Sequence, residues 1–483
     1  MNLSIIRYVI GSVLAIEGVL MTPFSLVGLI YHEKEGWAYL AVGLLTLTLG
    51  LLLRRKKPES TVFYLKEGCV STALCWVAMS VLGGLPFLLT GEIGSFTDAL
   101  FETVSGFTTT GASILVDVEA LSHPSLLWRS FTHWIGGMGV LVFVLAVLPM
   151  NGGSHMNLMR AESPGPSVGK LVPKVRYTAR ILYLIYIAMT VVMLLFLLPG
   201  DMNLFEALNT CFGTAGTGGF AIKRDSMASY SVYTQWVVTI FMILFGINFN
   251  AYYFLLLGRL KEAFTMEEVR GYLLIIAGAV AIIFCNILHQ CAGAFDALTK
   301  AAFQVASIIT TSGYATCDFD LWPAASRVVL VLLMFVGACA GSTGGGIKVS
   351  RFQIALKTIR KELGSFVHPK SIKKLQMDGK PIEHEVVRST NVYFLTYLLL
   401  FALFTLLVSL EGQDLVTTFT AVATTFNNVG PGLGAVGPMY SFAGLTNLSK
   451  WVLTFAMLAG RLELFPMLML FHPTLWRESF RGK

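Results

Sequence analysis

Long, continuous apolar runs separated by short polar segments dominate this chain. Continuous rather than alternating hydrophobicity excludes a membrane β-barrel, and about 20 apolar residues span a bilayer as an α-helix. The pattern therefore predicts a polytopic helical membrane protein. We expect ten spanning helices, at about 4–31, 37–53, 68–90, 128–149, 180–199, 232–257, 272–292, 326–347, 390–410 and 448–471.

Four connections between these runs are too apolar to be ordinary loops. Each begins with a short, helix-length apolar piece that carries a Phe, and each ends in Thr, Ser or Asn and then glycine. Because each lies between two spanning runs, the unit of helix, half-helix, polar glycine loop and helix occurs four times. The second copy is longer between its Phe and its glycine, so Gly218 stays an alternative to Gly219 there. The connections are 95–113, 203–220, 295–314 and 415–433, with glycines Gly111, Gly219, Gly313 and Gly430.

Four such loops around one axis would present rings of oxygen atoms to a bare cation. Non-helical backbone at membrane depth survives only where it is buried in protein or lines a water-filled cavity. Glycine permits positive φ, so that successive carbonyls point one way, and a half-helix aims its negative C-terminal end at the ion. Potassium prefers oxygen ligands that replace its water shell. Hydroxyls beside the glycines would add such ligands, namely those of Thr109, Thr110, Thr311 and Ser312. The candidate potassium-binding residues are Thr109, Thr110, Gly111, Thr217, Gly218, Gly219, Thr311, Ser312, Gly313, Asn428, Val429 and Gly430.

The composition agrees with a membrane protein, because 55% of the residues are hydrophobic and only 13% are charged. Soluble domains carry about 25% charged residues. The net charge of +7 comes from basic residues gathered in alternate connections, which predicts that these connections and both termini are cytoplasmic. This explanation leaves no reason to expect a nucleic-acid partner. The seven cysteines have no metal-binding spacing.

Acidic residues gather on the opposite side, near the start of the four apolar connections. One interpretation is that acids favour helix N-termini. The other is an outer vestibule that concentrates cations. The residues concerned are Asp98, Glu102, Asp201, Glu206, Asp296 and Asp414.

The loop motifs TTTGAS, GTGGF, TTSGY and NNVGPGL resemble the four pore loops of the Trk/Ktr/HKT superfamily of potassium transporters. GACAGSTGGGIKVSR at 337–351 and GRLELFP at 460–466 resemble that family's intramembrane loop and last helix, so the resemblance covers nearly the whole chain. It implies an all-α polytopic membrane protein with four pseudo-symmetric helix–pore-loop–helix repeats around one pore, preceded by two extra N-terminal helices. It also implies K⁺ as the transported ion and no cofactor. Family members with Ser at the first-loop glycine favour sodium, so Gly111 implies potassium.

The resemblance further implies a homodimer in the bacterial inner membrane, surrounded by lipid, with a cytosolic nucleotide-binding regulatory subunit of the TrkA type. The chain itself shows no nucleotide site, because GSTGGGIK lacks the preceding strand and the spacing of a phosphate loop. The segments 150–178 and 362–388 are candidates for contact with such a subunit. The expected units are an N-terminal pair of helices at 1–60 and pore repeats at 61–155, 170–262, 268–362 and 383–483.

A stretch of small residues at 337–346 interrupts the eighth apolar run. It marks either a close helix–helix contact or, as we prefer, a flexible strip beneath the filter that acts as a gate. Lys348, just beyond it, would then lie in the cytoplasmic cavity. The candidate gating residues are Gly337, Gly341, Ser342, Thr343, Gly344, Gly345 and Gly346.

Arg461 lies inside the last apolar run, where an ionisable residue usually faces a partner or a water-filled path. It either pairs with an acid such as Glu463 or, as the resemblance implies, lies below the filter and limits cation passage. Three other polar residues within or beside the spans, Glu17, His133 and Trp134, favour packing or interfacial roles.

These features favour a channel-like potassium uptake protein. The alternative is a carrier that moves potassium or sodium with a coupling ion, although no conspicuous chain of buried acids for a proton relay is evident. A membrane enzyme is disfavoured because the sequence has no nucleophile–base set and no HExxH motif. Flux far above ~10³ ions per second would exclude a carrier or an enzyme, since that rate is at the top of the usual enzyme range.

Overall fold

A computed structural model describes residues 1–58, 64–139, 175–369 and 374–480. The described part is almost entirely helical, and its single sheet is a two-stranded hairpin of β1 (Gln376–Met377) and β2 (Lys380–Pro381). Among the described residues, six helices are long and apolar enough to cross a membrane, or seven if a bent pair of helices is counted as one span. The helical content and these apolar helices together support an all-α polytopic membrane protein.

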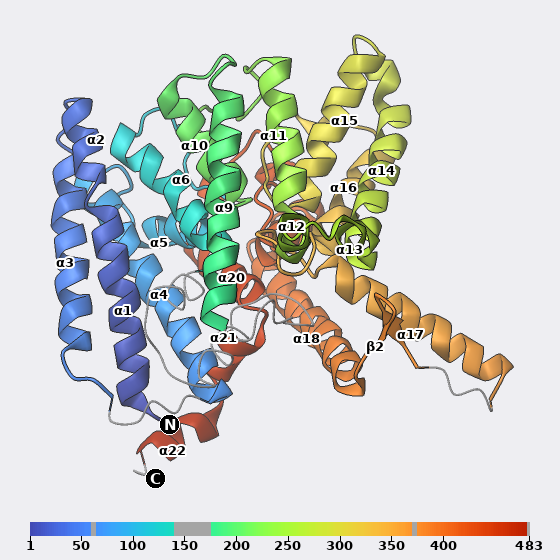
Figure 1. Ribbon diagram of the computed structural model, residues 1–483. Helices are drawn as coiled ribbons and strands as arrows, with labels where there is room; N and C mark the ends of the chain where they lie inside the picture. The colour runs from blue at the N-terminus through green and yellow to red at the C-terminus, as the bar shows by residue number, and fades with distance from the viewer. Residues whose placement is uncertain (59–63, 140–174, 370–373, 481–483) are drawn as a thin grey trace.

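The N-terminal unit consists of two antiparallel helices, α1 (Leu3–Met21) and α3 (Gly36–Arg54), joined through the short α2 (Phe24–Ile30). Small residues allow α1 and α3 to approach closely. A Cβ atom on Gly18 would lie 2.4 Å from the backbone nitrogen of Leu47, and one on Gly50 would lie 2.4 Å from that of Ala15. Figure 1 shows this unit at one edge of the molecule, beside α4.

Four groups of helices follow in the described residues, each with a central helix of 12–16 residues between one helix before it and one after it. The short helices are α5 (Phe96–Phe107), α10 (Leu204–Ala215), α15 (Ala294–Ile309) and α19 (Leu415–Phe426). The helices before them are α4 (Leu65–Thr90), α9 (Val175–Leu197), α14 (Glu267–Ile287) and α18 (His384–Ser409). The helices after them are α6 (His123–Gly137), α11 (Val232–Phe245), α16 (Ala324–Val336) and α20 (Asn447–Arg461).

The remaining elements are short or lie at the ends of these groups. They are α12 (Phe249–Leu256), α13 (Leu260–Thr265), α17 (Val349–Val367), α21 (Phe465–Met469), α22 (Pro473–Phe480) and the 3₁₀ turns η1 (Leu288–Gln290), η2 (Phe319–Leu321), η3 (Gly434–Val436) and η4 (Phe442–Gly444).

Burial is reversed relative to a soluble protein. The short helices are enclosed by protein, and every residue from Ala99 to Phe107 of α5 is buried, including the polar Glu102, Thr103 and Ser105. The outer helices instead expose large apolar side chains, such as Leu195 of α9 and Leu399 of α18. Apolar atoms outside and polar helix ends inside are what a bilayer solvent requires.

Three of the ten expected spans are broken. The sixth bends by 90° between α11 and α12. The eighth ends at Val336, because Gly337 has a φ of +69° and its Cβ position is filled by the carbonyl oxygen of Gly345 at 2.5 Å. The helix of the tenth span ends at Arg461, and two residues shortly after it, Glu463 and Leu464, have positive φ. The second half of the fourth expected span, 140–149, lies outside the described residues.

Replacing Gly18 by Ala tests the close contact of the N-terminal unit. The added methyl group would push against the backbone of α3, so we expect a loss of roughly 1–3 kcal/mol, as in other overpacked sites. Gly278→Ala, at a helical glycine with open space around its Cβ position, is the control and should be neutral or slightly stabilising. Melting temperatures of the purified protein in detergent measure both, and equal values would contradict the packing account.

Candidate ion pathway

The four short helices end in the same backbone conformation. In each, the residue two before the last glycine of the loop has positive φ, and so does that glycine. The intervening residue donates its N–H to a carbonyl five residues earlier, at 2.8–2.9 Å, which closes the helix end. The positive-φ pairs are Thr109 and Gly111, Thr217 and Gly219, Thr311 and Gly313, and Asn428 and Gly430. This fixes the register of the second loop, in which Gly219 takes the position of the other three glycines.

The loops contact one another in a closed ring. A Cβ atom on Gly111 would lie 2.0 Å from the carbonyl oxygen of Gly218 in the second loop. A Cβ atom on Gly219 would lie 1.7 Å from the carbonyl oxygen of Ser312 in the third loop, and one on Gly313 would lie 2.2 Å from that of Val429 in the fourth. Gly430 returns to the first loop, at 2.8 Å from the carbonyl oxygen of Thr110. Four backbone carbonyls, one from each loop, therefore converge on one ring, with the C-terminal ends of four helices behind them.

The hydroxyl groups beside the ring are mostly occupied by protein partners, which differs from our expectation. Thr110 and Ser312 form hydroxyl–hydroxyl bonds of 2.8 and 2.9 Å with the threonines two residues before them, Thr108 and Thr310. Thr311 accepts the N–H of Gly345 at 2.6 Å. Backbone carbonyls are thus the oxygen atoms that all four loops share at the ring.

A cavity of about 280 Å³ opens onto the ring from the side where the glycine loops leave it. All four ring glycines line it, and so do three basic residues, Arg129, Lys223 and Arg224. The six acidic residues expected to form a cation-concentrating vestibule do not line it. None of the six acidic side chains therefore forms part of the wall of this cavity.

The six acids have structural partners instead. Asp414 caps α19 by accepting the N–H of Thr417, which lowers the pKa of its carboxyl. Glu206 takes part in a capping box with Asn203 at α10. The others contact Lys450 (Asp98), Arg129 (Glu102), Ser231 and Thr234 (Asp201), and Lys300 (Asp296). The helix N-terminus interpretation thus describes several of them.

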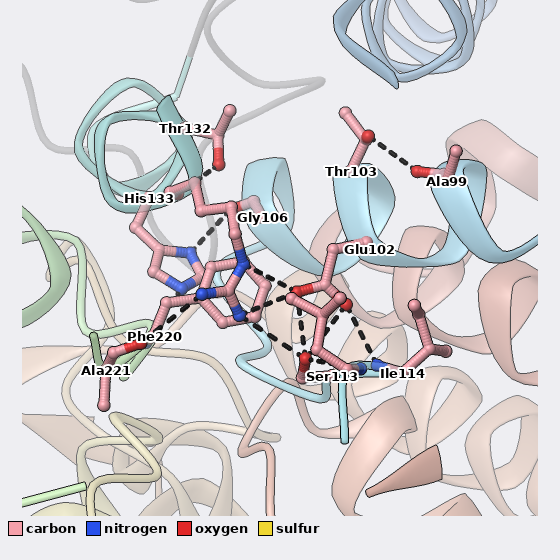
Figure 2. A network of polar contacts seen from close by, with 12 residues as sticks. Ala99, Glu102, Thr103, Gly106, Ser113, Ile114, Thr132, His133, Phe220 and Ala221 are labelled. Atoms are coloured by element: carbon pink, nitrogen blue, oxygen red, sulfur yellow. Dashed lines mark hydrogen bonds and ion pairs between the residues drawn. The ribbon is translucent and has the colours of Figure 1, made fainter. Parts of the chain in front are cut away.

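A buried ion pair supports the first loop from behind (Figure 2). Glu102 is 1% exposed and lies 2.7 Å from the guanidinium of Arg129, which is 3% exposed. The carboxylate also accepts the Ser113 hydroxyl and, at 3.0 Å, the N–H of Ile114, so it fixes the chain just after Gly111. Because all of these groups are buried, losing one partner would leave an uncompensated charge.

The same cluster reaches the second loop. The Arg129 guanidinium lies 4.0 Å from the ring centre of Phe220, the residue after Gly219. His133 accepts the N–H of Phe220 on Nε2 at 3.2 Å, and its Nδ1 lies 2.7 Å from the carbonyl oxygen of Gly106. Since Nε2 accepts, Nδ1 carries the proton and donates it to Gly106. His133 therefore joins the end of α5 to the second loop, a role that our packing interpretation missed, although an intramembrane histidine is a signal for one.

The small-residue strip 337–346 lies against the third and fourth loops, on the side away from the cavity. Gly345 donates to Thr311, and Gly346 donates to the carbonyl oxygen of Asn427 at 3.0 Å. Gly344 lies so close to the end of α15 that a Cβ atom would be 3.0 Å from the Thr310 carbonyl oxygen. Lys348 is buried rather than open to a cavity, and its ammonium donates to the carbonyl oxygen of Gly344.

Arg461 spans the space beside this strip. Its guanidinium donates to the carbonyl oxygen of Thr343 in the strip, at 2.9 Å, and to that of Gly137 at the end of α6, at 2.8 Å. Glu463, the acid expected as its alternative partner, pairs with Arg351 of α17 instead. A fixed positive charge thus bridges two of the four groups on the side away from the cavity.

Comparisons with known proteins agree with this arrangement. A family model described as a cation transport protein, TrkH, matches residues 38–480. The chain belongs to the TrkH family. The Trk system potassium uptake protein TrkH of Salmonella typhimurium is 36% identical over 96% of this chain and 97% of its own length. TrkI of Halomonas elongata is 33% identical over 94% and 93%.

A solved structure shows the same fold. The crystal structure of the potassium transporter TrkH from Vibrio parahaemolyticus superimposes with a TM-score of 0.89 at 31% identity, and covers 99% of this chain and 100% of its own. The resemblance expected from the motifs is confirmed. The TrkH family consists of transport proteins, which agrees with the expectation that the chain is not an enzyme.

Replacing His133 by Phe tests its place behind the loops. The Gly106 carbonyl and the Phe220 N–H would both lose a buried partner, and each such loss costs roughly 1–3 kcal/mol. We expect a clear fall in melting temperature. Trp134→Phe is the control, because it keeps an aromatic ring at the neighbouring position and the hydrogen bond of the Trp134 side chain to Thr190, at 3.3 Å, is partly buried. Equal melting temperatures for the two variants would contradict the assigned role of His133.

Proposed function

We propose that this chain takes up potassium through a single pore whose filter is the ring of four glycine loops. The closed set of glycine–carbonyl contacts among Gly111, Gly219, Gly313 and Gly430 carries the proposal. The names of the relatives from Salmonella typhimurium and Vibrio parahaemolyticus, a potassium uptake protein and a potassium transporter, support the choice of ion. The remaining residues that we assign to the filter are Thr109, Thr110, Thr217, Gly218, Thr311, Ser312, Asn428 and Val429.

The ring acts on a cation by replacing water. A potassium ion entering from the cavity loses hydration and gains carbonyl oxygens, and the four helix C-termini add negative potential at the same point. Of the basic residues that line the cavity, Arg129 is neutralised by Glu102, and the Lys223 ammonium lies 3.8 Å from the Glu206 carboxylate. Transport is therefore assigned to backbone geometry and not to a titrating side chain.

Below the ring, the strip 337–346 and Arg461 form the barrier to passage. The strip contacts the third and fourth loops, and the Arg461 guanidinium bridges the strip to α6. A positive charge in a space shared with the cation raises the energy of the ion there. We assign gating to Gly337, Gly341, Ser342, Thr343, Gly344, Gly345 and Gly346.

The setting follows from charge and from the family. The basic residues of α17 and of the C-terminal helix favour a cytoplasmic position for both termini in a bacterial inner membrane. We also propose a homodimer and a cytosolic nucleotide-binding subunit of the TrkA type. The relative from Salmonella typhimurium is named as part of a Trk system, which supports the presence of further components. The described parts of the contact region expected at 362–388 are 362–369, which include the end of α17, and 374–388, which include the hairpin and the start of α18. Most of the other expected region, 150–174, lies outside the described residues.

Gly111→Ser tests the filter. The new Cβ would overlap the Gly218 carbonyl oxygen, and φ of +77° is itself strained for a side chain. Rubidium uptake in a bacterium without its own potassium uptake systems should fall by about tenfold or more, given strain of roughly 1–3 kcal/mol, or shift toward sodium. Gly91→Ser is the matched control, since Gly91 has φ of +78° with open space around it. Unchanged uptake in the Gly111 variant would refute the filter.

Arg461→Ala tests the barrier. Removing the guanidinium takes away the fixed charge and the bridge from the strip to α6, so we expect rubidium flux to rise severalfold at matched protein levels. Arg259→Ala, which breaks an exposed ion pair with Glu262, should leave flux unchanged. A rate that stays the same for Arg461→Ala would show that this charge does not limit passage. Unitary flux far above ~10³ ions per second would also exclude a carrier.

A further inference from the structure

Two adjacent glutamates, Glu267 and Glu268, begin α14, and the second of them is buried. Glu268 is 4% exposed and accepts hydrogen bonds from three separate segments. Its Oε1 accepts the N–H of Ala340 at 2.6 Å and that of Ser350 at 3.2 Å, so it joins the small-residue strip at Ala340 to the first turn of α17 at Ser350. Its Oε2 accepts the Asn248 amide at 3.2 Å, at the bend between α11 and α12.

The bend and the strip are also joined directly. Phe249 donates its N–H to the carbonyl oxygen of Gly341 at 3.0 Å, and Cys339 donates to that of Gly246 at 3.1 Å. Positive φ at Gly337, Gly341 and Gly346 gives the strip hinge points along its length. At the bend, the strip is thus held by the Glu268 carboxylate and by these backbone bonds, in addition to its bonds with the third and fourth loops and with Arg461.

The preceding residue, Glu267, has a different set of partners, on the hairpin and on α17. Its N–H donates to the Asp378 carboxylate at 2.7 Å, and its Oε1 accepts the Asp378 N–H at 2.9 Å. Asp378 is the first residue of the two-residue turn between β1 and β2. The ammonium of Lys357 on α17 contacts the Glu267 carboxylate and also donates to the Gln376 carbonyl oxygen at 2.7 Å. Figure 1 shows α17 leaving the helical bundle with the hairpin beside it.

Neighbouring residues on a helix point about 100° apart, so the first turn of α14 has one acid inside the membrane domain and one at its cytoplasmic edge. The two side chains share a rigid helical turn. A displacement of the hairpin or of α17 therefore moves the Glu268 carboxylate relative to the strip. Acidic residues are favoured at a helix N-terminus in general. That preference does not explain why Glu268 bonds to the strip and Glu267 to the hairpin.

We propose that Glu267 and Glu268 link the cytoplasmic hairpin to the intramembrane strip, so that the position of the hairpin sets whether the strip is held beneath the filter. The link rests on the proposed function, because a held strip matters only if ions pass it. Glu268 is a positioning residue that restrains the strip through hydrogen bonds to Ala340 and Ser350. The hairpin and α17 are then the surface through which a cytoplasmic partner would act.

Hydrogen–deuterium exchange of the full chain in lipid nanodiscs tests the link without relying on transport. Glu268→Gln exchanges an ionised acceptor for a neutral one, and we expect the backbone of 337–350 to exchange about tenfold faster, as for losing a hydrogen bond to a charged group. Glu267→Gln, which does not touch the strip, should also raise exchange there. Glu262→Gln, in the exposed pair with Arg259, is the control and should not.

Exchange that is unchanged across 337–350 in Glu268→Gln would overturn the restraint, and unchanged exchange in Glu267→Gln would overturn the link to the hairpin. Rubidium flux into proteoliposomes is the second readout. Higher flux in Glu268→Gln than in the parent supports control of passage by the strip, and faster exchange with equal flux overturns it. If parent and variants all fail to conduct rubidium, the proposed function fails, whereas the exchange result still decides the mechanical link.

Discussion

Each ring glycine lies against a carbonyl oxygen of the next loop, and the rest of the structure depends on that contact. Three of the four Cβ positions would fall 1.7–2.2 Å from the oxygen, so no side chain fits between the loops. The contact brings four carbonyls together and requires each loop to begin at the end of a buried half-helix. Such helix ends are tolerated at membrane depth because protein surrounds them on every side.

The supports behind the ring explain how four separate loops keep one geometry. Glu102 and Arg129 fix the chain after the first loop, and His133 ties the first half-helix to the second loop. The third and fourth loops are held by the strip, through Thr311 and Asn427. One half of the ring thus rests on buried side chains and the other half on a segment with glycine hinges, and the second half is the one suited to move.

The repeat and its glycines could be predicted from the sequence because they are local patterns with a fixed spacing. The supports could not, because they join residues that are distant in the chain. Arg129 and Glu102 are 27 residues apart, and His133 meets Phe220 across 87 residues. Asp414 is the opposite case, since its partner is the local helix end, three residues away, as the helix N-terminus interpretation expects. The predicted eighth and tenth helices are longer than the observed ones, because hydropathy carries no information about the positive φ angles of Gly337 and Glu463.

The most direct test of the account is an anomalous-scattering crystal structure of the protein grown with thallium or rubidium in place of potassium. We predict a peak on the axis of the ring, coordinated by the carbonyl oxygens of Thr110, Gly218, Ser312 and Val429 that meet the four glycines. Bound ion confined to the side chains of the cavity, with the ring unoccupied at saturating ion, would contradict the claim that four backbone loops form one cation site.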